Sequence, residues 1–239
     1  MSEWFEQWFD EDYAQLYAHR DEAEAKRAVA TAFDKAPELT QGPVLDLACG
    51  GGRHLDVMRV RNPQAFGLDL SAVLLRQASQ DLKGHLLRGD MRHLPLQPHC
   101  LSGVCLWFTP FGYFDDVQNS NLLKQLHTLL RPGGVLLMDY LNAAQVKSNL
   151  VTEDTLERNG IRIHSHRRIE GHRIVKEMQL TRLGSGETRQ ALESVRIYEP
   201  DELVALSAKA GFTMRLSMGD YTGATFTSES PRWIGIFES

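Results

Sequence analysis

A short apolar run that ends in three consecutive glycines constrains the fold of this chain more than any other feature. It reads VLDLACGGG over residues 44–52, and RHLDVM follows at 53–58 with the composition of a helix. Largely apolar strands are typical of parallel sheets, whose ligands bind beyond the carboxyl ends of the strands. Because glycine has no Cβ, such a turn lets the backbone approach a ligand closely. The segment predicts a strand at 44–48 and a turn that either holds a nucleotide or simply closes tightly.

Strand and helix patterns alternate through the following ninety or so residues. Strands are predicted at 65–70, 85–88, 101–108 and 135–140, and helices at 72–82 and 119–130. Ser71 is a suitable N-cap for the first helix, and RPGG at 131–134 is expected to end the second. This alternation predicts an α/β fold: a Rossmann-like, seven-stranded, mostly parallel sheet with helices on both faces.

The pattern changes after about residue 141. Three strands are predicted at 160–169, 172–182 and 187–198, with turns at 170–171 and 184–187, and we interpret them as a small antiparallel meander. Arg162, His164, His166 and Arg168 fall on one face of the first strand, and Ile161, Ile163 and Ile169 on the other. We interpret the first face as a polar outer surface, and no metal site is expected. A helix at 200–210 and strands at 213–218 and 232–237 then complete the main sheet.

Composition and charge exclude several classes of protein. The 239 residues carry a net charge of −5 and no long basic block, so nucleic acid is not expected as a partner. Three cysteines without a CxxC pair suit a reducing compartment rather than a disulfide framework. The N-terminus lacks the basic and apolar regions of a signal peptide, and no apolar run approaches a membrane span. A cytoplasmic protein without a membrane partner is expected.

Two further acids accompany the glycine turn. Asp69 ends the second strand, 17 residues after Gly52, where a carboxylate can bind a ribose diol or cap a helix. Asp90 follows the third strand, where it can accept from an adenine amine or serve as a turn residue. The dinucleotide fingerprint GxGxxG needs a third glycine where Leu55 stands, which disfavours pyrophosphate binding. Asp46 lies four residues before Gly50.

Taken in order, these segments resemble the motifs of class I S-adenosylmethionine-dependent methyltransferases. VLDLACGGGRH resembles their first motif, FGLDLS the second, RGDMRHLP the third, VCLWFTPFGYF the fourth, and LLRPGGVLLMDY the segment that enters the fifth strand. The resemblance covers residues 40–142. GGG stands where GTG or GSG is more usual, a difference that the backbone tolerates. The resemblance implies the methyltransferase fold and S-adenosyl-L-methionine as cofactor.

The resemblance also implies roles by position. Ala48, Gly50 and Gly52 would border the methionine part of the cofactor. Asp69 would bind the ribose hydroxyls and Leu70 would flank the adenine. Asp90 and Met91 would hold the adenine edge and face, and Phe108 would border the sulfonium. Arg53 would lie near the methionine carboxylate or in solvent at the start of the helix.

The N-terminal segment FDEDYAQLYAHRDEAEAKRAV resembles the lid of small-molecule methyltransferases, including sugar N-methyltransferases. In that family the lid supplies an aromatic hydroxyl near the methyl donor and an arginine for the methionine carboxylate. Tyr17 and Arg20 are the matching residues, and the alternative is an amphipathic helix that packs its tyrosines. We therefore expect lid helices at 1–36, a cofactor-binding domain at 37–142 and 199–239, and the meander insertion at 143–198.

No catalytic residue follows from the sequence. Tyr17, His19 and Tyr113 are candidates for a base, although packing explains Tyr113 better than catalysis does, and His54 is expected to pack at the first helix. Cys49 and Cys105 are interpreted as buried, unreactive thiols.

The sequence predicts a methyltransferase that acts on a nitrogen or oxygen of a small molecule. The alternatives are an RNA or protein methyltransferase, a non-catalytic protein that binds S-adenosylmethionine, and an NAD-dependent oxidoreductase. The last of these is disfavoured because Leu55 replaces the third glycine. The meander could also serve as a homodimer interface.

Overall fold

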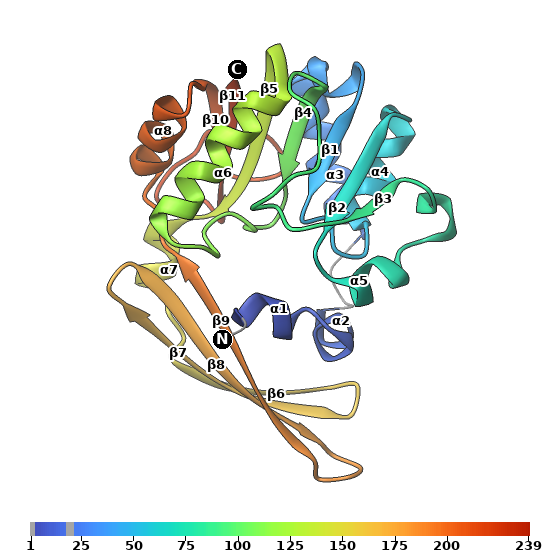
Figure 1. Ribbon diagram of the computed structural model, residues 1–239. Coiled ribbons are helices and arrows are strands. Elements are labelled where there is room, and N and C mark those ends of the chain that lie inside the picture. The colour runs from blue at the N-terminus through green and yellow to red at the C-terminus, as the bar shows by residue number, and fades with distance from the viewer. Residues whose placement is uncertain (1–2, 18–21) are drawn as a thin grey trace.

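The computed structural model describes residues 3–17 and 22–239, and two separate sheets dominate it (Figure 1). The main sheet has seven strands in the order β10-β11-β5-β4-β1-β2-β3. Its strands are β1 (Val44–Leu47), β2 (Ala65–Asp69), β3 (Leu86–Arg88), β4 (Leu101–Leu106), β5 (Leu130–Leu141), β10 (Thr213–Met218) and β11 (Arg232–Glu238). Strand β11 runs antiparallel to both of its neighbours, β10 and β5, and the other six strands run in one direction. The predicted seven-stranded, mostly parallel sheet is confirmed.

Helices cover both faces of this sheet, as the strand sequences require. Helices α3 (Glu22–Lys35) and α4 (Arg53–Arg61) pack on one face, and α6 (Asp116–Leu129) and α8 (Pro200–Lys209) on the other. Strand β5 shows why both faces must be covered, because its apolar side chains point to both of them. Leu136 and Met138 join one core cluster, whereas Val135 and Leu137 join the other. Each such side chain stabilises the fold by about 1.5–3 kcal/mol when fully buried.

Three predicted boundaries differ from the structure. The helix expected at 72–82 ends early, as α5 (Ala72–Gln77), and a 3-10 turn follows at Gln80–Leu82. The Ser71 cap is confirmed, since its hydroxyl accepts from the Leu74 N–H at 3.1 Å. Helix α6 begins at Asp116 because Asp115 caps it, accepting from the Gln118 N–H at 2.7 Å. The RPGG segment belongs to β5, where a register shift opposite Leu101–Gly103 accommodates a proline that has no N–H to donate.

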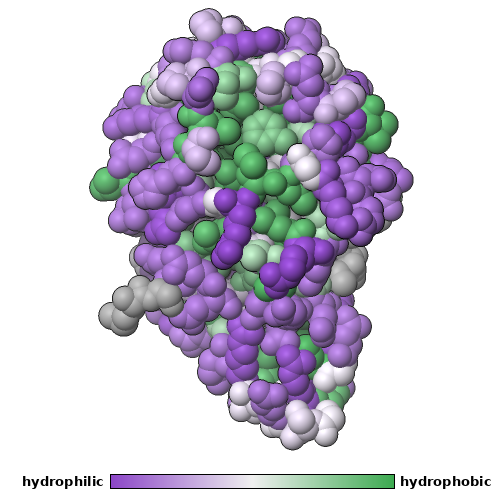
Figure 2. Space-filling model, turned by 45° about the vertical axis from the view of Figure 1, so that its right-hand side comes forward, coloured by the Kyte–Doolittle hydropathy of each residue, from purple (hydrophilic) through white to green (hydrophobic). Residues whose placement is uncertain are grey.

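The second sheet has four antiparallel strands, one more than predicted. They are β6 (Glu153–Arg158), β7 (Ile161–Glu170), β8 (Arg173–Arg182) and β9 (Thr188–Arg196), and α7 (Ala143–Ser148) precedes them. Strand β6 escaped prediction because nearly all its residues are exposed, so its sequence shows no apolar alternation. The face of this part of the molecule seen in Figure 2 is mainly hydrophilic.

The polar outer face of β7 is confirmed in part. Arg162, His164 and His166 are exposed while Ile161 and Ile163 are buried. Ile169 shares the alternation of Ile161 and Ile163, yet its side chain is 37% exposed, because it lies further along β7 than the residues that the N-terminal helices cover.

Helices α1 (Trp4–Trp8) and α2 (Glu11–Tyr17) lie between the two sheets (Figure 1). Trp8 and Leu16 pack with Ile161, Ile163 and Met178 of the small sheet, whereas Phe5 joins the core of the main sheet. The Asp12 carboxylate pairs with Arg182 at 2.5 Å and with Arg189 at 3.0 Å, which further holds these helices to the small sheet. The proposed division into lid, cofactor domain and insertion stays a prediction. Across the described ranges, every helix is too short or too polar to cross a bilayer.

Candidate functional site

The turn after β1 holds three residues in the left-handed conformation. They are Ala48 (φ 61°), Gly50 (φ 57°) and Gly52 (φ 81°). The N–H groups of Ala48 and Cys49 both donate to the Leu68 carbonyl, at 2.8 and 3.1 Å. The end of the neighbouring strand β2 therefore fixes the turn, and this fixing offsets the cost of about 1–2 kcal/mol for a left-handed alanine.

Asp69 joins the same turn through its side chain. Its Oδ2 accepts from the Gly50 N–H and its Oδ1 from the Ser71 N–H, both at 2.8 Å. Burial raises the pKa of this carboxyl group against the effect of these hydrogen bonds. Each carboxylate oxygen can accept a second hydrogen bond, so Asp69 can bind the turn and a ligand at once.

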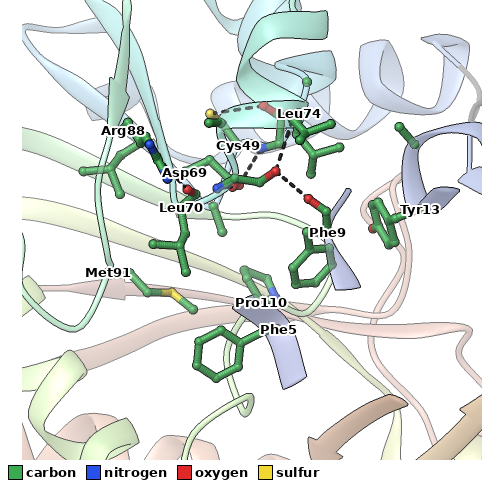
Figure 3. A pocket seen from close by; sticks show the side chains of 18 of the residues that line it. Phe5, Phe9, Tyr13, Cys49, Asp69, Leu70, Leu74, Arg88, Met91 and Pro110 are labelled. Carbon is green, nitrogen blue, oxygen red and sulfur yellow. Dashed lines mark hydrogen bonds between the residues drawn. The ribbon is translucent and has the colours of Figure 1, made fainter. Parts of the chain in front are cut away.

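A cavity of about 840 Å³ lies against this turn, at the carboxyl ends of β1, β2 and β4. Its volume suits a ligand the size of a nucleoside derivative. Figure 3 shows Asp69, Leu70 and Met91 on one part of its wall, with Phe5, Phe9 and Tyr13 of the N-terminal helices opposite. Eight of the predicted cofactor residues line the cavity: Tyr17, Ala48, Gly50, Asp69, Leu70, Asp90, Met91 and Phe108.

Among the described residues, Gly52 is the one predicted cofactor residue that does not line this cavity. Gly52 is buried behind the turn, where a Cβ would lie 2.2 Å from Leu82 Cδ1, so the lack of a side chain serves packing there. Arg20 and the candidate base His19 lie outside the described residues. The wall also includes Phe5, Phe9 and Trp107, which the sequence did not single out because aromatic residues in amphipathic segments usually indicate packing.

Asp90 is bound by a neighbouring arginine. Its carboxylate accepts from Arg92 Nε at 2.8 Å and Nη2 at 2.6 Å, and from the Arg92 N–H at 2.8 Å. Burial opposes ionisation of Asp90, but these hydrogen bonds and the charge of Arg92 outweigh it and lower its pKa. The guanidinium also pairs with Glu6 at 3.3 Å, which links helix α1 to this wall. Asp90 thus shapes a turn and lines the cavity.

Asp46 lies beneath the glycine turn and is completely buried. It accepts from the Leu55 backbone N–H, whereas its Oδ2 has no hydrogen-bond partner among the residues that the structure describes. Burial and then the charge of Asp69 raise its pKa well above the usual range. Since Asp46 also borders the cavity, an incoming ammonium group would satisfy this oxygen. The residues present therefore fit an amino-acid-bearing nucleoside.

A second strained turn follows β4. Phe108 (φ 63°) and Thr109 (φ 67°) are both left-handed, although neither is glycine. The Phe108 N–H donates to Asp139 Oδ2 at 2.7 Å and the Thr109 N–H to the Asp139 carbonyl at 2.9 Å. Arg232, which pairs with Asp139, donates to Thr109 Oγ1 at 2.7 Å and lies over the Phe108 ring. Residues of β5 and β11 thus hold this turn.

A second cavity of about 500 Å³ adjoins the first. Both are lined by Phe9, Tyr13, Tyr17, Phe108 and Tyr113. The second is also lined by Trp4, Glu24, Thr109, Leu141, Glu193 and Val195. Glu193 gave no signal in the sequence, because a glutamate on an amphipathic strand is normally in solvent. The two cavities meet at the aromatic residues, with Phe108 between them.

The remaining candidates occupy defined positions. Tyr17 donates to Glu193 Oε1 at 3.2 Å and accepts from Lys176 Nζ at 3.1 Å. Tyr113 packs against Trp4, with ring centroids 5.0 Å apart, as the packing interpretation expects. His54 is buried and stacks on Trp107 at 4.9 Å, which confirms its predicted packing.

The two thiols are buried or nearly so, and burial raises the pKa of both Cys49 and Cys105. Their predicted lack of reactivity follows from this environment. Within the described ranges, no cluster of three or more His, Cys, Asp or Glu side chains is arranged to hold a metal ion.

Comparison with known proteins agrees with this architecture. Residues 44–134 match a family model described as a methyltransferase domain. An uncharacterized methyltransferase of Geobacillus kaustophilus is 27% identical over 145 residues, which cover 56% of this chain and 63% of that protein. The chain thus spans less than two thirds of the length of this relative.

Two further proteins match most of the chain. The dTDP-3-amino-3,4,6-trideoxy-α-D-glucopyranose N,N-dimethyltransferase of Streptomyces venezuelae is 27% identical, with coverage of 80% of this chain and 78% of the relative. The crystal structure of an S-adenosylmethionine-dependent methyltransferase from Clostridium acetobutylicum has a TM-score of 0.81 at 16% identity, over 95% of this chain and 97% of that one. This last likeness concerns the fold.

Four observations agree with one another. They are the order of motifs in the sequence, the strand order with an antiparallel β11, the cavity against the glycine turn and the match to a methyltransferase domain. Residues 44–134 therefore form a methyltransferase domain, and the chain has the fold of S-adenosylmethionine-dependent methyltransferases.

Proposed function

We propose that this protein transfers a methyl group from S-adenosylmethionine to a nitrogen or oxygen of a small molecule. The observation that carries the proposal is the pair of adjoining cavities, of about 840 and 500 Å³, that share one aromatic wall. The first cavity contacts the glycine turn and suits the donor. The second is large enough for a small acceptor and too small for a folded macromolecule.

The wall of the larger cavity supplies a partner for each part of the donor. Asp69 accepts from the ribose hydroxyls, while Leu70 and Met91 flank the adenine beside Asp90. Asp46 accepts from the ammonium group of the methionine part, and Arg53, which also lines this cavity, pairs with its carboxylate. Phe108 lies at the boundary with the second cavity and so borders the sulfonium.

When bound, the donor supplies a methyl group on cationic sulfur: the acceptor's lone pair forms the new bond as the carbon–sulfur bond breaks, its electrons go to sulfur, and the acceptor's proton goes to water. The protein's own residues orient the two partners and exclude water. The N-terminal segment covers both cavities through Phe9, which follows α1, and through Tyr13 and Tyr17 of α2. Alignment of this kind supplies up to about 7–11 kcal/mol in well-oriented reactions.

The relative from Streptomyces venezuelae, whose name describes N-methylation of an amino sugar, supports a small-molecule acceptor. An NAD-dependent oxidoreductase is disfavoured by Leu55, which is fully buried where a third glycine would be needed. Methylation of RNA or protein fits poorly with an acceptor cavity of this size, and a non-catalytic role leaves the second cavity unexplained.

Calorimetric titration of the purified protein tests the proposal. S-adenosylmethionine and S-adenosylhomocysteine are expected to bind with micromolar affinity while NAD produces no heat of binding. Binding of NAD alone would contradict the proposal, as would a folded protein that binds none of the three. Release of S-adenosylhomocysteine in the presence of a panel of small amines and alcohols would then establish turnover.

A further inference from the structure

We propose that the second cavity takes an acceptor with a positively charged amine, and that Glu193 determines this specificity. The inference rests on the proposed function, since it names the acceptor class of the same site. It is carried by the position, surroundings and charge of one carboxylate that the small sheet contributes to the cavity wall.

Glu193 is fixed in place by two donors from the N-terminal helices. Its Oε1 accepts from Trp8 Nε1 at 2.7 Å and from the Tyr17 hydroxyl at 3.2 Å. Its Oε2 has a cation, Lys176 Nζ, only at the longer distance of 3.7 Å. The side chain is 25% exposed, so it is reachable from the cavity that it lines. One oxygen therefore orients the carboxylate, and the other can accept from a ligand.

The charges that the described residues bring to this cavity have one sign. Among the described residues in its wall, the charged side chains are Glu24 and Glu193. Their cationic partners lie outside that wall: Arg53 approaches Glu24 at 3.7 Å and lines the donor cavity instead, and Lys176 approaches Glu193 from β8. Burial is the main effect that lowers the pKa of Lys176.

The uncharged part of the wall favours the same ligand. Trp4, Phe9, Tyr13, Tyr17, Phe108 and Tyr113 contribute aromatic rings. Ring faces carry partial negative charge and attract ammonium groups, most strongly where water is excluded. An anionic acceptor would instead meet two carboxylates, and its desolvation would find no compensating cation in the described wall.

Methylation of an amine needs no reactant besides the methyl donor and water. The ammonium form is attracted into the cavity and loses one proton to water, because only the neutral nitrogen has a lone pair to donate. The nitrogen–carbon bond forms as the carbon–sulfur bond breaks. The product leaves with one more methyl group, either as a cation or after loss of a second proton to water. Glu193 acts as a specificity-determining residue that binds the cation.

Three probes of matched shape and different charge test this inference: 2-phenylethylamine, 2-phenylethanol and 3-phenylpropionate. Each is titrated into protein saturated with S-adenosylhomocysteine. The amine is expected to bind at least tenfold more tightly than the acid, with the alcohol between them. In Glu193→Gln, which keeps an oxygen for Trp8 and Tyr17, the amine should lose about tenfold in affinity while the alcohol changes by less than twofold.

Two further variants serve as controls. Glu177→Gln makes the same charge change on the exposed face of β8, where Glu177 pairs with Arg168, and should leave all three affinities unchanged. Glu24→Gln tests the second carboxylate of the cavity and should lower the affinity for the amine alone. This variant keeps the inference testable if Glu193→Gln does not fold.

The outcomes separate the inference from the proposed function. If the wild-type protein does not bind S-adenosylhomocysteine, the proposed function fails and the inference fails with it. If S-adenosylhomocysteine binds but the acid binds as tightly as the amine, only the inference is overturned. The same holds if both glutamine variants keep the full preference for the amine.

Discussion

The turns after β1 and after β4 lie at the same edge of the main sheet, and both contain left-handed residues, yet they are held by different means. The first contains Gly50 and Gly52, and its anchors, Leu68 and Asp69, come from the next strand along the chain. The second consists of Phe108 and Thr109, which pay the steric cost of a left-handed backbone with a Cβ.

The second turn depends on residues far away in the sequence. Asp139 follows Phe108 by 31 residues, and Arg232 is 123 residues beyond Thr109. Tyr221 donates to the same Asp139 oxygen as Phe108, at 2.7 Å. A local glycine motif therefore builds one wall of the larger cavity, whereas long-range polar contacts hold a turn that both cavities share.

The largest effect is expected from Asp139→Ala, which removes the support of the second turn. The carboxylate is fully buried, and its loss leaves the Arg232 guanidinium, 17% exposed, and the Phe108 N–H without that partner. We expect a loss of about 3–5 kcal/mol in the free energy of unfolding, measured with urea. Tyr221→Phe, which removes one hydrogen bond to the same group, should cost about 1 kcal/mol. Equal losses in the two variants would mean that Asp139 does not support this turn.

Asp69→Ala tests the link between the first turn and the donor. Loss of a charged acceptor for the ribose hydroxyls should weaken S-adenosylhomocysteine binding by more than tenfold, or about 1.5–3 kcal/mol. Calorimetry measures this directly. Asp154→Ala, an exposed acid on the small sheet that pairs with Arg167, provides the control and should not change the affinity. An unaltered affinity in Asp69→Ala would remove this residue from the site.

Gly52→Ala and Gly51→Ala test which glycine of the first turn is required for packing. A Cβ at φ 81° would lie 2.2 Å from Leu82 Cδ1, so we expect a loss of about 1–3 kcal/mol in stability. In Gly51→Ala the nearest atom would be the Leu74 carbonyl oxygen at 3.9 Å, and the stability should change little. Thermal unfolding compares the two, and a larger loss in Gly51→Ala would contradict the packing role of Gly52.

The smallest expected effect concerns the pH dependence of Asp46. Because burial raises the pKa of this carboxyl in the folded state, the folded protein retains a proton that the unfolded chain loses near pH 4. Stability therefore falls as the pH rises from about 4 toward the folded-state pKa. Asp46→Asn has no proton to lose, so its stability relative to the wild type should increase over that range. Urea unfolding at pH 4.5 and 7 measures the difference, and a difference that does not grow with pH would contradict the assignment.

Local sequence signals predicted the first turn well. The glycine run, the acid that ends β2 and the Ser71 cap each depend on neighbours within about twenty residues, so short-range pattern and backbone preference specify them. The same signals failed for β6, whose exposed residues lack alternation, and for RPGG, which a register shift admits into β5.

The tertiary structure alone decided the second cavity, where we propose that the acceptor binds. Glu193 resembles any solvent-facing glutamate until α1 and α2 fold over the small sheet and bring Trp8 and Tyr17 to it. Phe108 and Thr109 carry no sign of a left-handed turn, because the contacts that stabilise it come from β5 and β11. By itself the sequence determined the fold class and the glycine turn that lines the larger cavity, through periodicity and glycine content that act locally. Only folding determined the second cavity, because its wall joins side chains from the N-terminal segment, both sheets and α3, which approach one another once their apolar faces are buried.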